Sequence, residues 1–160
     1  MQYTEKIQDL FATGDDYYLA HCISADFGMG AGIVIQFNKR FNMKKKLQQN
    51  YLGYLDFYRN LDTPGDCILE GRVFNLITKE RYYQKPTLES MENALIVMRD
   101  ICLEYGIKKI AMPTIGAGLD KLRWPDVVKL IYKVFEDTDI EILVCKLRDK
   151  TLERDMPERE

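Results

Sequence analysis

The sequence predicts an α/β sandwich, in which helices cover both faces of a largely parallel or mixed sheet. Short apolar runs typical of buried strands alternate along the chain with longer segments whose apolar residues recur at helical spacing. With 160 residues, 46% of them apolar, the chain is long enough for one buried core and short for two ordinary domains. We therefore expect one domain over residues 1–147, followed by a charged tail over residues 148–160.

The strands are predicted from short runs rich in β-branched, aromatic and other apolar residues. They cover residues 17–23, 67–69, 73–78, 109–112 and 140–145, and a weaker strand lies near residues 2–7. Helices are predicted at residues 31–41, 87–105 and 125–136, the last with Pro125 and Asp126 in its first turn. Residues 42–61 are polar and tyrosine-rich, and we expect them to be helical as far as the turn Asp62-Thr63-Pro64-Gly65-Asp66.

The tail differs in composition from the rest of the chain. Nine of its 13 residues are charged, and only Leu152 and Met156 are large and apolar. Such a segment buries too little apolar surface to offset the entropy of ordering it. We expect a disordered tail or a frayed helix.

The overall charge argues against unspecific nucleic-acid binding. The chain has 23 basic and 25 acidic residues, a net charge of -2, and lacks the global positive field on which such binding relies. No apolar run approaches the ~20 residues that span a bilayer, and the first residues do not resemble a signal peptide. We expect a soluble monomer with no membrane partner, cytoplasmic or, in a eukaryotic cell, nuclear.

Cysteine and histidine usage excludes several kinds of site. Cys22, Cys67, Cys102 and Cys145 are widely separated within apolar stretches, a pattern of neither a disulfide framework nor a zinc knuckle. His21 is the single histidine, so a zinc site would need scattered thiols and carboxylates, and a Ser-His-Asp triad has one candidate base. On a strand, His21 and Cys22 point to opposite faces, which argues against a Cys-His dyad. We expect reduced core cysteines, no metal and no cofactor.

Two glycine-rich segments follow two of the predicted strands. Gly28-Met29-Gly30-Ala31-Gly32 leads into the helix at 31–41, and Ile115-Gly116-Ala117-Gly118-Leu119-Asp120 precedes the helix at 125–136. Such loops let backbone N–H groups approach a phosphate, and a helix N-terminus adds favourable partial charge. Neither has the spacing of a P-loop or a dinucleotide fingerprint, and each alone also fits a plain turn. If the strands are parallel, the loops share one edge of the sheet and form a crevice suited to a diphosphate.

Two charged side chains flank this predicted crevice. Asp120 closes the second loop, where a carboxylate is unfavourable for binding an anion, so it is either a general base, a ribose-hydroxyl acceptor or an ordinary turn residue. Lys79 ends the predicted strand at 73–78, and its pattern alone indicates a solvated strand-end lysine.

The ordered motifs resemble the macrodomain family, and within it the terminal ADP-ribose protein glycohydrolase branch, which also includes the macrodomains of DNA-ADP-ribosyl glycohydrolase antitoxins. The resemblance runs from about Tyr3 to Leu147. It is carried by Leu19-Ala20-His21-Cys22-Ile23-Ser24, Met29-Gly30-Ala31-Gly32-Ile33, Leu76-Ile77-Thr78-Lys79 and Met112-Pro113-x-Ile115-Gly116-x-Gly118-Leu119-Asp120-x-Leu122-x-Trp124.

The resemblance implies a three-layer α/β/α macrodomain sandwich with a mixed central sheet. It also implies that Lys79 attacks the anomeric carbon of the distal ribose and that Asp120 assists and resolves the adduct. The residues expected to contact ADP-ribose are Asp9 and Leu10 near the adenine, Ser24 near the distal ribose, Met29, Gly30, Ala31, Gly32 and Ile33 in the first loop, Thr114, Ile115, Gly116, Ala117, Gly118 and Leu119 in the second, and Leu147.

Three positions depart from the family pattern. Gln8 stands where a glycine is usual, Thr114 replaces an arginine, and Cys145 replaces an aromatic residue that could stack on adenine. These changes affect how the adenine would be packed. Because Lys79 and Asp120 are retained, the pattern favours an enzyme over a module that only binds.

The resemblance leaves the modified target open. The expected partners are ADP-ribose and an ADP-ribosylated protein, as a glutamate or aspartate ester, with O-acyl-ADP-ribose as a further substrate. The alternatives are thymidine-linked ADP-ribose on DNA, an ADP-ribose-binding module without turnover, and a phosphatase acting on an ADP-ribose phosphate monoester.

Overall fold

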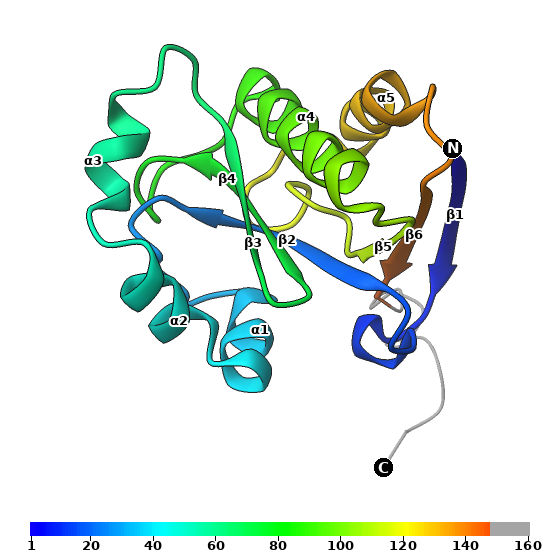
Figure 1. Cartoon of the computed structure of the whole chain (residues 1–160), viewed down its shortest axis with the longest axis horizontal. Helices are drawn as coiled ribbons and strands as arrows, with labels where there is room; N and C mark the ends of the chain where they lie inside the picture. The colour runs from blue at the N-terminus through cyan, green and yellow to red at the C-terminus, as the bar shows by residue number, and fades with distance from the viewer. Residues whose placement is uncertain (148–160) are drawn as a thin grey trace, which may run out of the picture.

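A six-stranded mixed sheet forms the centre of the protein, in the order β1-β6-β5-β2-β4-β3 (Figure 1). The computed structural model describes residues 1–147, and the predicted tail at 148–160 lies outside the described residues. The strands are β1 (Gln2–Ile7), β2 (Tyr18–Ser24), β3 (Asp66–Glu70), β4 (Val73–Lys79), β5 (Lys109–Met112) and β6 (Glu141–Lys146). All neighbouring pairs are parallel except β3 and β4, which form an antiparallel hairpin. The mixed sheet is thus confirmed.

Helices cover both faces of the sheet, which gives the three layers (Figure 1). One layer holds α4 (Leu88–Tyr105) and α5 (Trp124–Phe135). The other holds the 3-10 turn η1 (Leu10–Ala12) with α1 (Val34–Phe41), α2 (Met43–Asn50) and α3 (Tyr54–Arg59). Within residues 1–147, no helix combines the length and hydropathy needed to cross a membrane.

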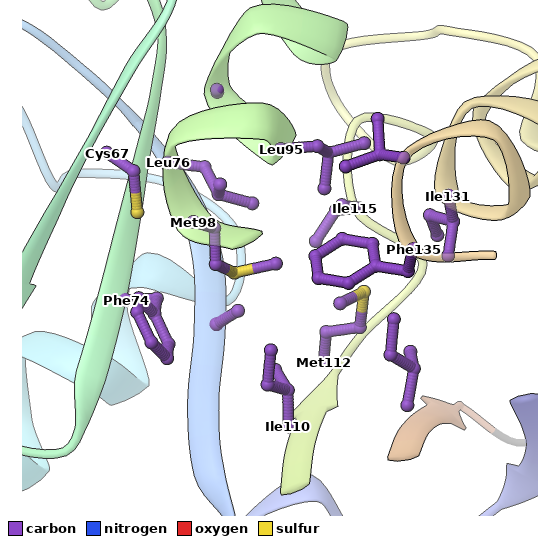
Figure 2. Close-up of a cluster of buried hydrophobic side chains, with 14 of the residues drawn as sticks. Cys67, Phe74, Leu76, Leu95, Met98, Ile110, Met112, Ile115, Ile131 and Phe135 are labelled. Carbon is purple, nitrogen blue, oxygen red and sulfur yellow. The ribbon is translucent and has the colours of Figure 1, made fainter. Parts of the chain in front are cut away.

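The core beneath α4 and α5 is built from strand residues that alternate in direction. Leu95 and Met98 of α4 and Phe135 of α5 are fully buried against Phe74 of β4 and Ile110 of β5 (Figure 2). Successive strand side chains point to opposite faces, so Val73 and Ile77 of β4 enter the second core instead. This two-sided burial explains why Val73, Phe74, Leu76 and Ile77 of β4 are all apolar, although they point to alternate faces.

The second core lies between the sheet and the short helices. Phe37 of α1, Leu47 of α2 and Tyr58 of α3 pack against Leu19 of β2 and Ile77 of β4. Segment 42–61 is helical as predicted, but it forms two helices, because Gly53 has a φ of +75° that an α-helix cannot continue through.

The helix predicted at 31–41 begins three residues later than expected. Gly32 adopts a φ of +75°, which belongs to the left-handed region and not to a right-handed helix, so α1 starts at Val34. The first glycine segment is therefore a loop throughout. The prediction that a helix begins within this segment, at Ala31, is wrong.

His21 lies in the second core as a neutral side chain. Its Nε2 lies 2.6 Å from Asn75 Oδ1, and its ring stacks on Phe37 with centroids 3.9 Å apart. Because Asn75 Nδ2 donates to the carbonyls of Ile68 and Val73, Asn75 Oδ1 is left to accept from His21 Nε2. Complete burial lowers the pKa of His21 to about 4, against the opposing hydrogen bond to Asn75.

This buried imidazole should make the protein sensitive to acid. Between pH 6.5 and 4 the unfolded histidine binds a proton and the folded one does not, so the free energy of unfolding falls as the pH drops through this window. The pKa difference corresponds to at most about 3 kcal/mol. In urea titrations at pH 7, 6 and 5, we expect His21→Phe to be less stable at pH 7 but to lose less stability on acidification. An equal pH slope in both proteins would contradict this account.

Candidate active site at the carboxyl edge of the sheet

Three loops meet where β2, β4 and β5 end. β2 is parallel to both β4 and β5 and lies between them, so all three strands finish at the same edge. The loops are residues 25–33 after β2, residues 80–87 after β4 and residues 113–123 after β5. The two glycine loops therefore share one edge, as the sequence predicts for parallel strands.

An ion pair joins the end of β4 to the second glycine loop. Lys79 Nζ donates to Asp120 Oδ1 at 2.7 Å, with side chains 13% and 16% exposed. The register between β2 and β4 shifts after the Ile23–Ile77 pair, so that Ser24 pairs with Lys79. Such irregularities re-aim the side chains beyond them. The result is an amine and a carboxylate in direct contact at the edge where the glycine loops lie.

Asp26 ties the first glycine loop to the loop after β4. Its Oδ1 accepts from the Ser24 hydroxyl at 2.5 Å and from the Gly28 amide at 3.1 Å, and its Oδ2 accepts from the Tyr82 amide at 3.1 Å. Burial opposes the charge on Asp26, but these hydrogen bonds and nearby Arg81 outweigh it and lower the pKa of the carboxyl group. Asp26 is therefore a charged brace beneath the site.

The glycines of the two loops have different roles. A Cβ at Gly30 or Gly118 would meet no atom within 4 Å, so backbone at both positions borders open space. A Cβ at Gly32 would lie 3.2 Å from Leu119 Cδ1, which shows that the loops touch there. Lys85 Nζ donates to the Leu119 carbonyl at 2.7 Å and holds the second loop from the other side.

Several predicted ligand contacts have side chains that point into the core. Leu10, Met29 and Ile115 are buried in the hydrophobic clusters, so only their backbone groups are available to a ligand. Ser24 is also buried, and its hydroxyl hydrogen is donated to Asp26, so its oxygen is left to act as an acceptor.

Asp9 and Leu147 lie further along the same edge, beyond the ends of β1 and β6. Asp9 caps η1, because its Oδ1 accepts from the Phe11 amide at 3.0 Å. Burial, and then the nearby charge of Asp9, raise the pKa of the Cys145 thiol. Leu147 is exposed directly after β6.

Cys22 lies next to the ion pair without the properties of a nucleophile. Burial, and then the charge of Asp120, raise the pKa of its thiol well above the usual value. The reactive form of cysteine is the thiolate, which these surroundings disfavour. Cys22 packs beside the α4 layer and His21 in the opposite core, so the two cannot form a dyad. Among residues 1–147, no three histidine, cysteine or carboxylate side chains are grouped as a metal site requires.

Comparisons with known proteins agree with this architecture. No protein-family model matches the chain. The structure resembles the macrodomain of Mycobacterium tuberculosis DarG, with a TM-score of 0.74, 20% identity, and coverage of 92% of this chain and 99% of that one. The fold, with its paired glycine loops at one sheet edge, is that of a macrodomain.

Sequence relatives give the narrower assignment. The chain is 42% identical over 142 residues to the human protein named ADP-ribose glycohydrolase OARD1, which covers 87% of this chain and 88% of the human one. A Thermus aquaticus protein named DNA ADP-ribosyl glycohydrolase is 27% identical over 111 residues, which are 68% of this chain and 31% of that protein. The chain belongs to the OARD1 family of macrodomains, which confirms the branch predicted from the motifs.

Sequence reasoning missed Asp26 and Lys85. Asp26 lies two residues after the Ser24 that the motifs identify, and an Asp whose side chain can accept from the amide two residues on is a common turn signal that could have indicated its role. Lys85 contacts a backbone carbonyl 34 residues away, and no local pattern signals such a contact.

Asp26 variants should distinguish the hydrogen bonds made by its two carboxylate oxygens, one to the Gly28 amide and one to the Tyr82 amide. Asp26→Ala removes both acceptor oxygens, and we expect a loss of about 2 kcal/mol in the free energy of unfolding, as for hydrogen bonds to a partly buried charge. Amide exchange at Gly28 and Tyr82 should accelerate at least tenfold, as measured by NMR. Asp26→Asn keeps one acceptor oxygen and should release only one of the two amides. Unchanged exchange in Asp26→Ala would refute the bracing role.

Proposed function

We propose that this protein is an ADP-ribosyl glycohydrolase that removes mono-ADP-ribose from glutamate or aspartate esters, with Lys79 as nucleophile and Asp120 as acid/base. The observation that carries the proposal is the 2.7 Å contact between Lys79 Nζ and Asp120 Oδ1 at the edge where the glycine loops meet. A nucleophile within hydrogen-bond reach of a base is the arrangement that covalent catalysis requires. The identity to human OARD1 supports the same activity.

The ligand would extend along the carboxyl edge of the sheet. Asp9, beyond β1, is the acceptor for the adenine amino group, and Leu147 lies beside it after β6. Backbone N–H groups of residues 29–33 and 114–119 hold the diphosphate, which is favoured by the open space at Gly30 and Gly118. This order brings the distal ribose to Ser24 and Lys79, at the ends of β2 and β4.

In the first chemical step Lys79 must become neutral, because a protonated amine has no electron pair to donate. Asp120 accepts a proton from the amine, and Nζ attacks the anomeric carbon of the distal ribose. The bond between that carbon and the ester oxygen breaks, and the glutamate or aspartate departs as a carboxylate with the electron pair. ADP-ribose is left linked to Lys79 through a carbon–nitrogen bond.

In the second step water releases the ribose. Asp120 returns its proton to the nitrogen of Lys79 as the carbon–nitrogen bond breaks with its electron pair going to nitrogen. It then accepts a proton from the water that attacks the anomeric carbon and releases that proton to solvent. Free ADP-ribose leaves, and the amine and carboxylate are restored. Both steps take place at the anomeric carbon. O-acyl-ADP-ribose is therefore a substrate only where its acyl group lies within reach of Lys79 and Asp120.

A second candidate is the removal of ADP-ribose from thymidine in DNA. The segments 79–85 and 118–123 contain five cationic and two acidic residues in a chain whose net charge is -2. This local excess attracts an anionic target, and the name of the Thermus aquaticus relative specifies DNA. Loops 29–33 and 114–119 alone would suffice for a binding module or a phosphatase, neither of which needs the Lys79–Asp120 pair.

Truncation of the lysine tests the mechanism. We expect Lys79→Ala to lower turnover of a glutamate-linked mono-ADP-ribosyl peptide at least a thousandfold, with the Kd for ADP-ribose within about threefold by calorimetry, because the amine acts on the reacting carbon and not on the diphosphate. Lys109→Ala is the matched control, since Lys109 pairs with Asp16 at 2.8 Å near the start of β5. Normal turnover by Lys79→Ala would exclude the lysine mechanism.

Removal of the aspartate tests the second step. Asp120→Ala should accumulate protein whose mass is increased by one ADP-ribosyl group, because solvent can still deprotonate Lys79 slowly, whereas the adduct once formed is not resolved. Peptide mapping should place the group on Lys79, and the double variant Lys79→Ala, Asp120→Ala should show no adduct. If no mass increase is seen at any time between seconds and hours, the intermediate is not covalent.

A further inference from the structure

We propose that a cavity beyond Lys79, between α3 and the start of α4, receives the acceptor side chain from which ADP-ribose is removed, and that it is built for the carboxylate of an acidic residue in a peptide. This inference rests on the proposed function. It assigns a binding site to the acceptor side chain of the substrate, which the proposed function leaves without one.

The cavity has a volume of about 390 Å³, within the rough range of 300–1,000 Å³ for small-molecule sites. Its walls come from the end of α3, the turn before β3, the end of β4 and the start of α4. The lining residues on which the argument depends are Tyr58, Arg59, Leu61, Lys79, Glu80 and Lys85. A smaller hollow of about 300 Å³ lies at the opposite edge, around the starts of β1, β5 and β6, away from the ion pair.

The position of the cavity follows from the order of the strands. Adenine, diphosphate and distal ribose would occupy the edge from β1 to β4, so the reacting carbon ends up beside Lys79. The next strand along the sheet is β3, and the cavity lies over the β4–β3 side of the edge. Lys79 lines the cavity and also contacts Asp120 of the second glycine loop, whereas no residue of 28–33 or 114–120 lines it. The acceptor begins one bond from the anomeric carbon and needs space there.

The wall of the cavity is rigid. The Tyr58 hydroxyl accepts from the Gly65 amide at 3.0 Å, and the Asn93 side chain donates to the Pro64 carbonyl at 2.7 Å. A Cβ at Gly65 would lie 2.4 Å from the Ser90 carbonyl, so the turn is packed on α4 at a distance that only glycine permits. A preformed wall holds a leaving group without the entropy cost of ordering a loop.

The chemistry of the lining favours an anion. Three cationic residues, Arg59, Lys79 and Lys85, line the cavity with one acidic residue, Glu80, which Arg59 contacts at 3.2 Å. The Thr78 hydroxyl is buried beside the Cys22 thiol and does not face the cavity. Donors aimed at developing charge speed its formation, and the charge that develops here is on the departing carboxylate.

A nucleobase fits the cavity less well. Stacking of a base requires an exposed aromatic face, and the single aromatic residue in the lining, Tyr58, is buried with its hydroxyl engaged by Gly65. The exposed rings of Tyr82 and Tyr83 lie outside the cavity lining. The lining therefore matches a flexible acidic side chain.

Filling the cavity tests the proposal. We expect Leu61→Trp to lower kcat/KM for a glutamate-linked mono-ADP-ribosyl peptide at least tenfold, with the Kd for free ADP-ribose within twofold, because ADP-ribose carries no acceptor. Leu52→Trp makes the same change at an exposed position outside the lining and should leave both values unchanged. Arg59→Gln removes a cation of the lining and should lower kcat/KM on the peptide about fivefold, whereas Arg59→Lys should retain most of it. Circular dichroism melting confirms that each variant is folded.

A thymidine-linked oligonucleotide is assayed in parallel. A larger loss on the oligonucleotide than on the peptide would show that the cavity takes a base and would overturn the assignment to a carboxylate. Equal losses of peptide turnover and ADP-ribose affinity would make it part of the ADP-ribose site. If the unaltered protein turns over the peptide and both Leu61→Trp and Arg59→Gln behave like it, this inference alone fails. Absence of any turnover by the unaltered protein refutes the proposed function as well.

Discussion

The parallel pairing of β2 with both β4 and β5 is the constraint on which the site depends. Parallel neighbours end at the same edge, so residues far apart in sequence, such as Ser24, Lys79 and Asp120, meet there. The contact between Lys79 and Asp120 spans 41 positions and is fixed by strands whose side chains are buried on both faces. A shift of β4 by one residue in its register would move each of its side chains to the opposite core, at a large cost in free energy. The two-sided burial thus fixes the position of the ion pair.

Much of this architecture could be predicted from the sequence, because burial leaves a periodic signal. The six strands, the helices α4 and α5 and the shared edge of the glycine loops all follow from apolar spacing and from the rule for parallel strands. The start of α1 was missed because Gly32 adopts a left-handed φ where it packs against Leu119, a residue far along the chain. Local patterns contain no record of such contacts.

The residues of the site were predictable to different degrees. Asp120 attracts attention on chemical grounds, since a carboxylate beside a phosphate-type loop is unfavourable without a task. Lys79 required the family resemblance, because a strand-end lysine looks the same whether it faces solvent or a carboxylate. The irregular register after Ile23, which re-aims Lys79, and the three hydrogen bonds of Asp26 depend on atomic positions that no residue pattern specifies. These features are visible in the structure and are not indicated by the spacing of residues in the sequence.

The reduced cysteines have a practical consequence for solution work. Burial raises the pKa of Cys22, Cys67, Cys102 and Cys145, so at neutral pH very little of any of them is present as the thiolate that alkylating reagents attack. Within the described residues, the folded protein therefore has no cysteine that reacts readily with such reagents. A cysteine introduced at exposed Leu119 or Tyr83 could be labelled with a maleimide dye while the natural thiols remain intact. Such a probe would report events at the crevice by fluorescence without first removing core residues.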